Sequence, residues 1–176
     1  MSVHGATVGA SEAVTGGSIH RQWQRLSGLP GGRWLFGRLI ARKVPYSGTV
    51  AARVEEMGAG LVRVRMRDRR AVRNHLDSIH ACAQVTLGEM ASGLAMLTRI
   101  SDDARAIVTG LEIEYLKKAR GTLIARGESP AVEPGVRREY VATAEIKDAS
   151  GDAVSRLRVR WLVGPRRAAG EQPGAS

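Results

Sequence analysis

One segment in the middle of the chain, residues 79–100, is apolar on nearly every side of the helix that it can form. It contains no proline and no alternation of apolar and polar residues, so its pattern favours a helix over a strand. A helix that is hydrophobic all round is a buried helix, and Ser78 is placed to cap its first turn. The rest of the chain must therefore fold around this helix.

The segments on both sides of this helix have the patterns of strands. Arginines alternate with apolar residues over 61–67 and again over 156–163, so each of these strands has one apolar face. The predicted strands lie within residues 46–58, 61–69, 106–119, 121–128, 136–151 and 153–164. Two strands before the helix and four after it predict an α+β fold in which one antiparallel sheet wraps around the long central helix.

The N-terminal part of the chain has a different character. Residues 21–44 carry six cationic side chains among several aromatic and aliphatic ones, which predicts a basic amphipathic helix, interrupted around 28–32 by glycine and proline. We expect this extra helix to pack across a sheet edge or over a pocket, and peripheral contact with a membrane surface is the alternative. Residues 1–20 and 165–176 are expected to form a disordered leader and tail, which leaves one domain over 45–164.

Composition excludes several classes of protein. A single cysteine, Cys82, rules out an internal disulfide framework and favours a reducing compartment. No segment has the roughly 20 apolar residues of a membrane span, and the N-terminal residues lack the features of a secretory signal, so a cytoplasmic location is expected by default. Half of the net charge of +10 lies in residues 1–43, so nucleic-acid binding is not favoured.

Glu89 is the one ionisable residue in the most apolar part of the predicted helix. A buried carboxylate must be paired, protonated or in contact with water, so Glu89 is either salt-bridged by an arginine or part of a functional site. His80 lies nine residues earlier, about 13 Å along a helix and half a turn away. If both residues serve one site, a second subunit must bring them together. The N–H groups at the helix N-terminus could stabilise an oxyanion there.

The run from Asn74 to Glu89 resembles the motif of the phenylacetate-degradation (PaaI-like) thioesterases and their uncharacterised hotdog relatives. That motif is an Asn, then His-Gly-Gly, four variable residues, and Leu-Ala-Asp or Leu-Gly-Glu; Asn74, His80, Leu87 and Glu89 match it. The similarity covers roughly residues 45–163. It implies a hotdog fold, a homodimer or dimer of dimers with sites at the interface, and hydrolysis of an acyl-CoA or acyl-carrier thioester without a cofactor.

The resemblance also implies a role for each matching residue. Glu89 would be the nucleophile or general base, Asn74 and His80 would orient the water or the thioester carbonyl, and the N–H of Ala81, with that of Cys82, would stabilise the oxyanion. The two motif glycines are Ala81 and Cys82 here, so a non-catalytic hotdog module that binds acyl-CoA or a lipid-like ligand is the alternative function. We expect the Cys82 thiol to be packed in the core.

Three basic residues after the next predicted strand, Lys117, Lys118 and Arg120, could bind the phosphates of CoA. The alternative is a solvated strand end. Neither His75 nor His80 has a second ligand at metal-binding spacing, so no metal site is expected.

Overall fold

The computed structural model describes residues 16–166. In chain order the elements are α1 (Ser18–Ser27), α2 (Gly32–Lys43), α3 (Pro45–Gly48), β1 (Arg53–Gly58), β2 (Leu61–Met66), the short 3-10 helix η1 (Arg70–Val72), α4 (Ala81–Leu97), β3 (Ala104–Tyr115), β4 (Leu123–Glu128), β5 (Arg138–Lys147) and β6 (Ala153–Pro165). The predicted leader and tail lie mostly outside the described residues. Within them, Ser18–His20 belong to α1 and Pro165 ends β6, so these residues are not part of a leader or tail.

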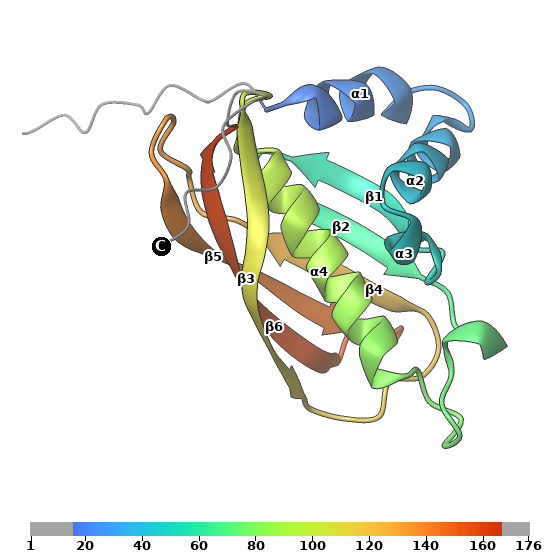
Figure 1. Ribbon diagram of the computed structural model, residues 1–176. Helices are drawn as coiled ribbons and strands as arrows, with labels where there is room; N and C mark the ends of the chain where they lie inside the picture. Colours follow the sequence, from blue (N-terminus) through green and yellow to red (C-terminus); the bar gives the residue numbers. More distant parts are fainter. Residues whose placement is uncertain (1–15, 167–176) are drawn as a thin grey trace, which may run out of the picture.

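The six strands form one antiparallel sheet in the order β1-β2-β4-β5-β6-β3. Figure 1 shows α4 lying against one face of this sheet, with β3 on one side and the helices α1 to α3 on the β1 side. This arrangement confirms the predicted α+β fold, in which two strands precede the central helix and four follow it.

The long helix packs closely on the sheet because small residues separate their backbones. An added Cβ at Gly127 of β4 would lie 2.2 Å from the carbonyl carbon of Ala91, so helix and strand approach to backbone contact here. On the helix itself, an added Cβ at Gly88 would lie 2.5 Å from Leu157 of β6. The apolar residues of α4 therefore reach the core, where Leu87, Ala91, Ala95 and Met96 have no exposed surface.

The predicted alternation of the strands is confirmed. In β2 the residues Val62, Val64 and Met66 are fully buried, while Arg63 and Arg65 lie on the other face of the sheet. In β6 the apolar residues from Leu157 to Val163 are buried at every second position. The apolar faces of both strands point to the side that α4 covers.

The basic N-terminal segment forms two helices rather than one. Gly31 has a positive φ of 73°, a conformation that glycine adopts without steric cost, and it separates α1 from α2. Trp23 and Phe36 pack edge to face with ring centroids 5.2 Å apart, and both are buried in the core. Since α2 packs on β1, an edge strand of the sheet, the expected packing across a sheet edge is confirmed.

The first predicted strand begins later than expected. Residues 45–48 form α3, with Pro45 in its first turn, where the missing N–H of proline costs no hydrogen bond. Ala51 then takes the left-handed conformation, with φ of 48°, and β1 starts at Arg53. The prediction of strand structure directly after Pro45 was therefore wrong.

Candidate active site

One stripe of α4 remains open in the single chain. Ala81 and Cys82 are exposed, and Val85 and Glu89 are half-buried, whereas almost all other residues of the helix are buried. Residues 81, 85 and 89 lie on one face because they are four positions apart. The prediction that the helix is buried on all sides was thus wrong for this stripe, which none of the strands within residues 16–166 covers.

Glu89 lies at the end of the open stripe farther from Ala81, and burial raises the pKa of its carboxyl group above the ordinary value of 4.5. Among residues 16–166, no basic side chain pairs with this carboxyl, so the alternative of a salt bridge to an arginine is not supported. An added Cβ at Gly93 would lie 2.9 Å from the ring of Trp161 and 3.7 Å from Glu89 Oε1. The Glu89 carboxyl and the Trp161 indole therefore both lie next to Gly93.

The Trp161 indole has an unusual polar environment. Its Nε1 is buried and has no hydrogen-bond partner within the described part of the chain. A carboxyl group that is desolvated beside an aromatic ring favours the protonated form, as the pKa of Glu89 indicates. Sequence reasoning did not include Trp161 in the site, because alternation on β6 marks it only as a core residue.

His80 is the N-cap of α4, a role that the sequence assigned to Ser78. Its Nδ1 accepts a hydrogen bond of 3.0 Å from the backbone N–H of Cys82. In a neutral imidazole the other nitrogen, Nε2, then carries the proton and can donate it to a ligand. Because the Cys82 N–H already has an acceptor, the expected oxyanion role of Cys82 is not supported. The Ala81 N–H has no protein acceptor in residues 16–166.

The Asn74 side chain organises the loop before α4. Its Oδ1 accepts hydrogen bonds from the backbone N–H groups of Leu76, at 2.9 Å, and Ser78, at 3.3 Å, and from the Ser78 hydroxyl at 3.1 Å. Asp77 completes this turn with a left-handed backbone. The Asn74 oxygen therefore fixes the entry to the helix, and its amide nitrogen is the part left for a ligand.

The three basic residues after β3 do not act as one group. Lys117 Nζ binds Asp148 at 2.8 Å and Asp152 at 2.6 Å, which raises the pKa of the lysine and occupies it within the chain. Lys118 and Arg120 are exposed, and they flank Ala119, whose carbonyl accepts the Ile79 N–H at 2.8 Å. These two residues therefore lie close to the start of α4.

Cys82 is exposed, so the prediction of a packed core thiol was wrong. It lies in the first turn of α4, on the stripe that the sheet leaves open. Burial raises the pKa of Tyr115, at the end of β3, and the neighbouring Cys82 raises it further. Cys82 and Tyr115 thus form one end of the open stripe, and Glu89 lies toward the other.

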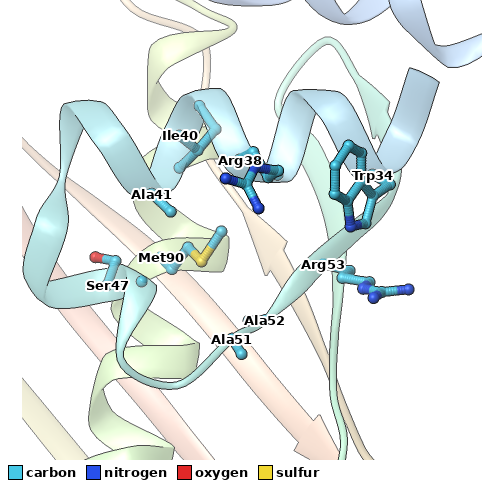
Figure 2. Close-up of a pocket in the computed structure, with 11 residues that line it drawn as sticks. Trp34, Arg38, Ile40, Ala41, Ser47, Ala51, Ala52, Arg53 and Met90 are labelled. Carbon is cyan, nitrogen blue, oxygen red and sulfur yellow. The ribbon is translucent and has the colours of Figure 1, made fainter. Parts of the chain in front are cut away.

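Two of the hollows in the molecule lie near α2 and β1, and Glu89 lines neither of them. One of about 300 Å³ lies between α2, α3 and β1, and it is lined by Trp34, Arg38, Ser47, Arg53 and Met90 among others (Figure 2). The sequence predicted an amphipathic helix across a sheet edge or over a pocket, but not the residues that line this hollow, because residues 33–53 come together only through the turn after α3. Among residues 16–166 there is no group of three metal-ligating side chains, and no helix could cross a membrane.

The chain is similar to a described family and to solved structures. A family model described as a domain of unknown function, DUF4442, matches residues 32–163. No curated protein matches the chain. A structural-genomics target aligns over 84% of this chain and 98% of its own length, at 24% identity and a TM-score of 0.71.

Two further similar structures are of a thioesterase and of a probable thioesterase. A thioesterase from Haemophilus influenzae aligns over 72% of this chain and 87% of its own, at 13% identity and a TM-score of 0.64. A protein of unknown function from Pseudomonas aeruginosa, called a probable thioesterase, aligns over 78% of this chain and 97% of its own, at 23% identity and a TM-score of 0.64. These likenesses confirm the predicted hotdog fold.

Proposed function

The chain belongs to the DUF4442 family, and we propose that it is a thioesterase that hydrolyses an acyl-CoA or acyl-carrier thioester. The single observation that carries the proposal is the Glu89 carboxyl, which is desolvated, has no basic partner among residues 16–166, and lies on the open stripe of α4. A carboxyl group whose pKa is raised toward neutral pH is suited to accept a proton from water. The thioesterases among the structural neighbours support the same reaction class.

The proposed reaction uses Glu89 and the start of α4. Glu89 attacks the thioester carbonyl itself, or takes a proton from a water molecule that attacks it. The carbonyl oxygen becomes negatively charged and accepts hydrogen bonds from the Ala81 N–H and from His80 Nε2. The carbon–sulfur bond then breaks, and the thiolate leaves and takes up a proton. If water is the nucleophile, the acyl group is released directly as a carboxylic acid. If Glu89 is the nucleophile, the acyl group is held as an anhydride on Glu89, and a water molecule hydrolyses it to the free acid and the restored carboxylate.

A dimer is required because Glu89 and the helix N-terminus of one chain are about 13 Å apart along α4. One edge of β3 pairs with β6, while the other is the free edge of the sheet. Ile107, Val108 and Tyr115 expose between 38% and 47% of their surface there. In our proposal the β3 strands of two copies pair around a two-fold axis, which places Glu89 of one protomer beside Ala81 and His80 of its partner.

Lys118 and Arg120 are the proposed contacts for the phosphates of the carrier. Both are exposed beside the start of α4, and within residues 16–166 neither has a carboxylate partner. Lys117 is left out of this proposal, because Asp148 and Asp152 already bind it.

The test is the release of thiol from a panel of acyl-CoA thioesters of increasing chain length. We expect Glu89→Gln to lower kcat by at least about 100-fold, the usual contribution of a general base. The matched control is Glu56→Gln, since Glu56 is an exposed residue of β1. The double variant Lys118→Gln/Arg120→Gln should raise KM with little change in kcat. Equal rates for the wild type, Glu89→Gln and Glu56→Gln would remove Glu89 from the mechanism.

A second candidate function is a non-catalytic module that binds the thioester. It is favoured by the side chains of Ala81 and Cys82, which replace the two motif glycines at the exposed start of α4, and by the Cys82 N–H, which already donates to His80. Saturable binding of acyl-CoA without any release of thiol would support this function over hydrolysis.

A further inference from the structure

Five arginines line one hollow at the β1 edge of the sheet, far along the sheet from β3. The hollow has a volume of about 320 Å³, and Trp34 and Glu55 lie in its wall. We call it the arginine hollow; its basic residues are Arg33, Arg53, Arg65, Arg67 and Arg69. They come from α2, from the paired strands β1 and β2, and from the segment after β2.

The positive charge of the arginine hollow is mostly uncompensated. Glu55 is the only acidic residue in the wall, and it lies 3.8 Å from Arg65 and 3.4 Å from Arg63 outside the hollow. Within residues 16–166, no carboxylate lies at ion-pair distance from Arg33, Arg53 or Arg67. Like charges in one concavity repel each other, so this arrangement favours the binding of an anion.

The hollow between α2, α3 and β1 adjoins the arginine hollow. Both hollows are lined by Trp34, Ala51 and Arg53, so they share a wall. Trp34 is 51% exposed, and the Arg38 guanidinium lies 5.1 Å from the centre of its ring. Figure 2 shows Trp34 flanked by the side chains of Arg38 and Arg53.

The adjoining hollow has room for a flat ring. Small residues, among them Gly37, Ala41 and Ala52, form its sides, and Ile40 and Met90 also line it. Its volume of about 300 Å³ is in the range of small-molecule sites. An exposed indole beside such a space can stack on a nucleobase, whose identity matters little for stacking.

We propose that the two hollows form one binding site for a nucleotide polyphosphate. The phosphates lie among the guanidiniums of the arginine hollow, which match phosphate oxygens in bidentate geometry. The base lies against Trp34 in the adjoining hollow. A concave site favours such a small ligand over a flat membrane surface. Glu89 lines neither hollow, so nucleotide binding here can be measured apart from any hydrolysis of a thioester.

The test is calorimetric titration of the full chain with three probes: inorganic pyrophosphate, ADP and adenosine 3′,5′-bisphosphate. We expect saturable binding that weakens with salt, with both nucleotides tighter than pyrophosphate. Arg53→Gln/Arg67→Gln should weaken all three by about 100-fold, since a hydrogen bond to a charged group contributes about a factor of ten. Trp34→Leu should weaken the nucleotides only. Because these residues are exposed, circular dichroism should show that the variants remain folded.

The matched control is Arg126→Gln/Arg158→Gln, which removes two exposed arginines from β4 and β6. Equal weakening by this control would overturn the site in favour of unspecific attraction. Equal affinity for pyrophosphate and nucleotides, unchanged by Trp34→Leu, would overturn the role of the ring. Association with phosphatidylglycerol vesicles but with none of the probes would reassign the surface to a membrane.

A titration with CoA identifies the source of the nucleotide. Loss of CoA binding in Arg53→Gln/Arg67→Gln, with binding retained in Lys118→Gln/Arg120→Gln, assigns the nucleotide end of CoA to the arginine hollow. Retained CoA binding in Arg53→Gln/Arg67→Gln, with loss of ADP binding, shows that a free nucleotide is the ligand. Both results support the site, and absence of all binding overturns it.

Discussion

The Glu89 carboxyl links the chemistry of the site to the stability of the fold. Burial raises its pKa in the folded chain, so between the ordinary value of 4.5 and the raised value the folded state holds a proton that the unfolded state has lost. The free energy of unfolding should therefore fall as pH rises through this window. Below the window Glu89 makes no difference to the pH dependence, because both states are protonated.

The variant Glu89→Gln should remove this loss of stability. We expect wild type and variant to have a similar midpoint of urea denaturation at pH 4, and the variant to be the more stable at pH 8. Activity should show the opposite trend in the wild type, rising with pH as Glu89 ionises. A difference in stability that is the same at both pH values would show that burial does not perturb this carboxyl.

At the scale of single residues, the sequence predicted only part of the candidate site. It identified Glu89, because one ionisable residue in an apolar helix is visible without a structure. It misplaced the cap, since Ser78 and His80 can both accept a backbone N–H and only the path of the loop decides between them. The sequence also did not predict that Trp161 lies near Glu89. No pattern within β6 or within α4 indicates which residues of the strand will face which residues of the helix.

At the scale of the elements, small residues allow α4 and the sheet to pack closely together. On the helix, Gly88 and Gly93 leave space for Leu157 and Trp161 of β6, which lie against them. The strand side of the contact, Gly127, could not be predicted. Gly127 matters because it is the residue of β4 that faces Ala91. Its position there is set by the pairing of β4 with β2 and β5, which the sequence does not specify.

Gly127→Ala should destabilise the fold, because the added Cβ would lie 2.2 Å from the backbone of α4, which cannot move as a flexible side chain can. We expect a loss of about 1–3 kcal/mol in the free energy of unfolding, as for other overpacked cores. Chemical denaturation measures it. The matched control is Gly58→Ala in β1, where an added Cβ meets no atom within 4 Å. Equal losses would mean that the close contact is not the cause.

At the scale of the whole molecule, β3 has a free edge (Figure 1), and in the proposed dimer this edge brings the two halves of the site together. Ile107→Lys/Val108→Lys puts two ammonium groups on this edge and should weaken a dimer by at least about 100-fold, because burying an unpaired charge costs several kcal/mol. Activity should fall with the dimer. Sedimentation equilibrium measures the association, and Leu35→Lys/Leu39→Lys is the control at exposed positions of α2, at the β1 edge of the sheet. A monomeric wild type, or a monomeric variant with full activity, would contradict the shared site.

The position of β3 in the sheet also has a consequence for how the chain is made. It is the first strand after α4, yet its partner in the sheet is β6, the last strand of the described residues. Thr109 and Arg160, which meet across this pair, are 51 positions apart in the sequence. During synthesis β3 therefore has no strand to pair with until β6 has also been synthesised. Until then both of its edges are open to other chains. The interval between these two strands is the period in which a nascent chain is most exposed to mispairing.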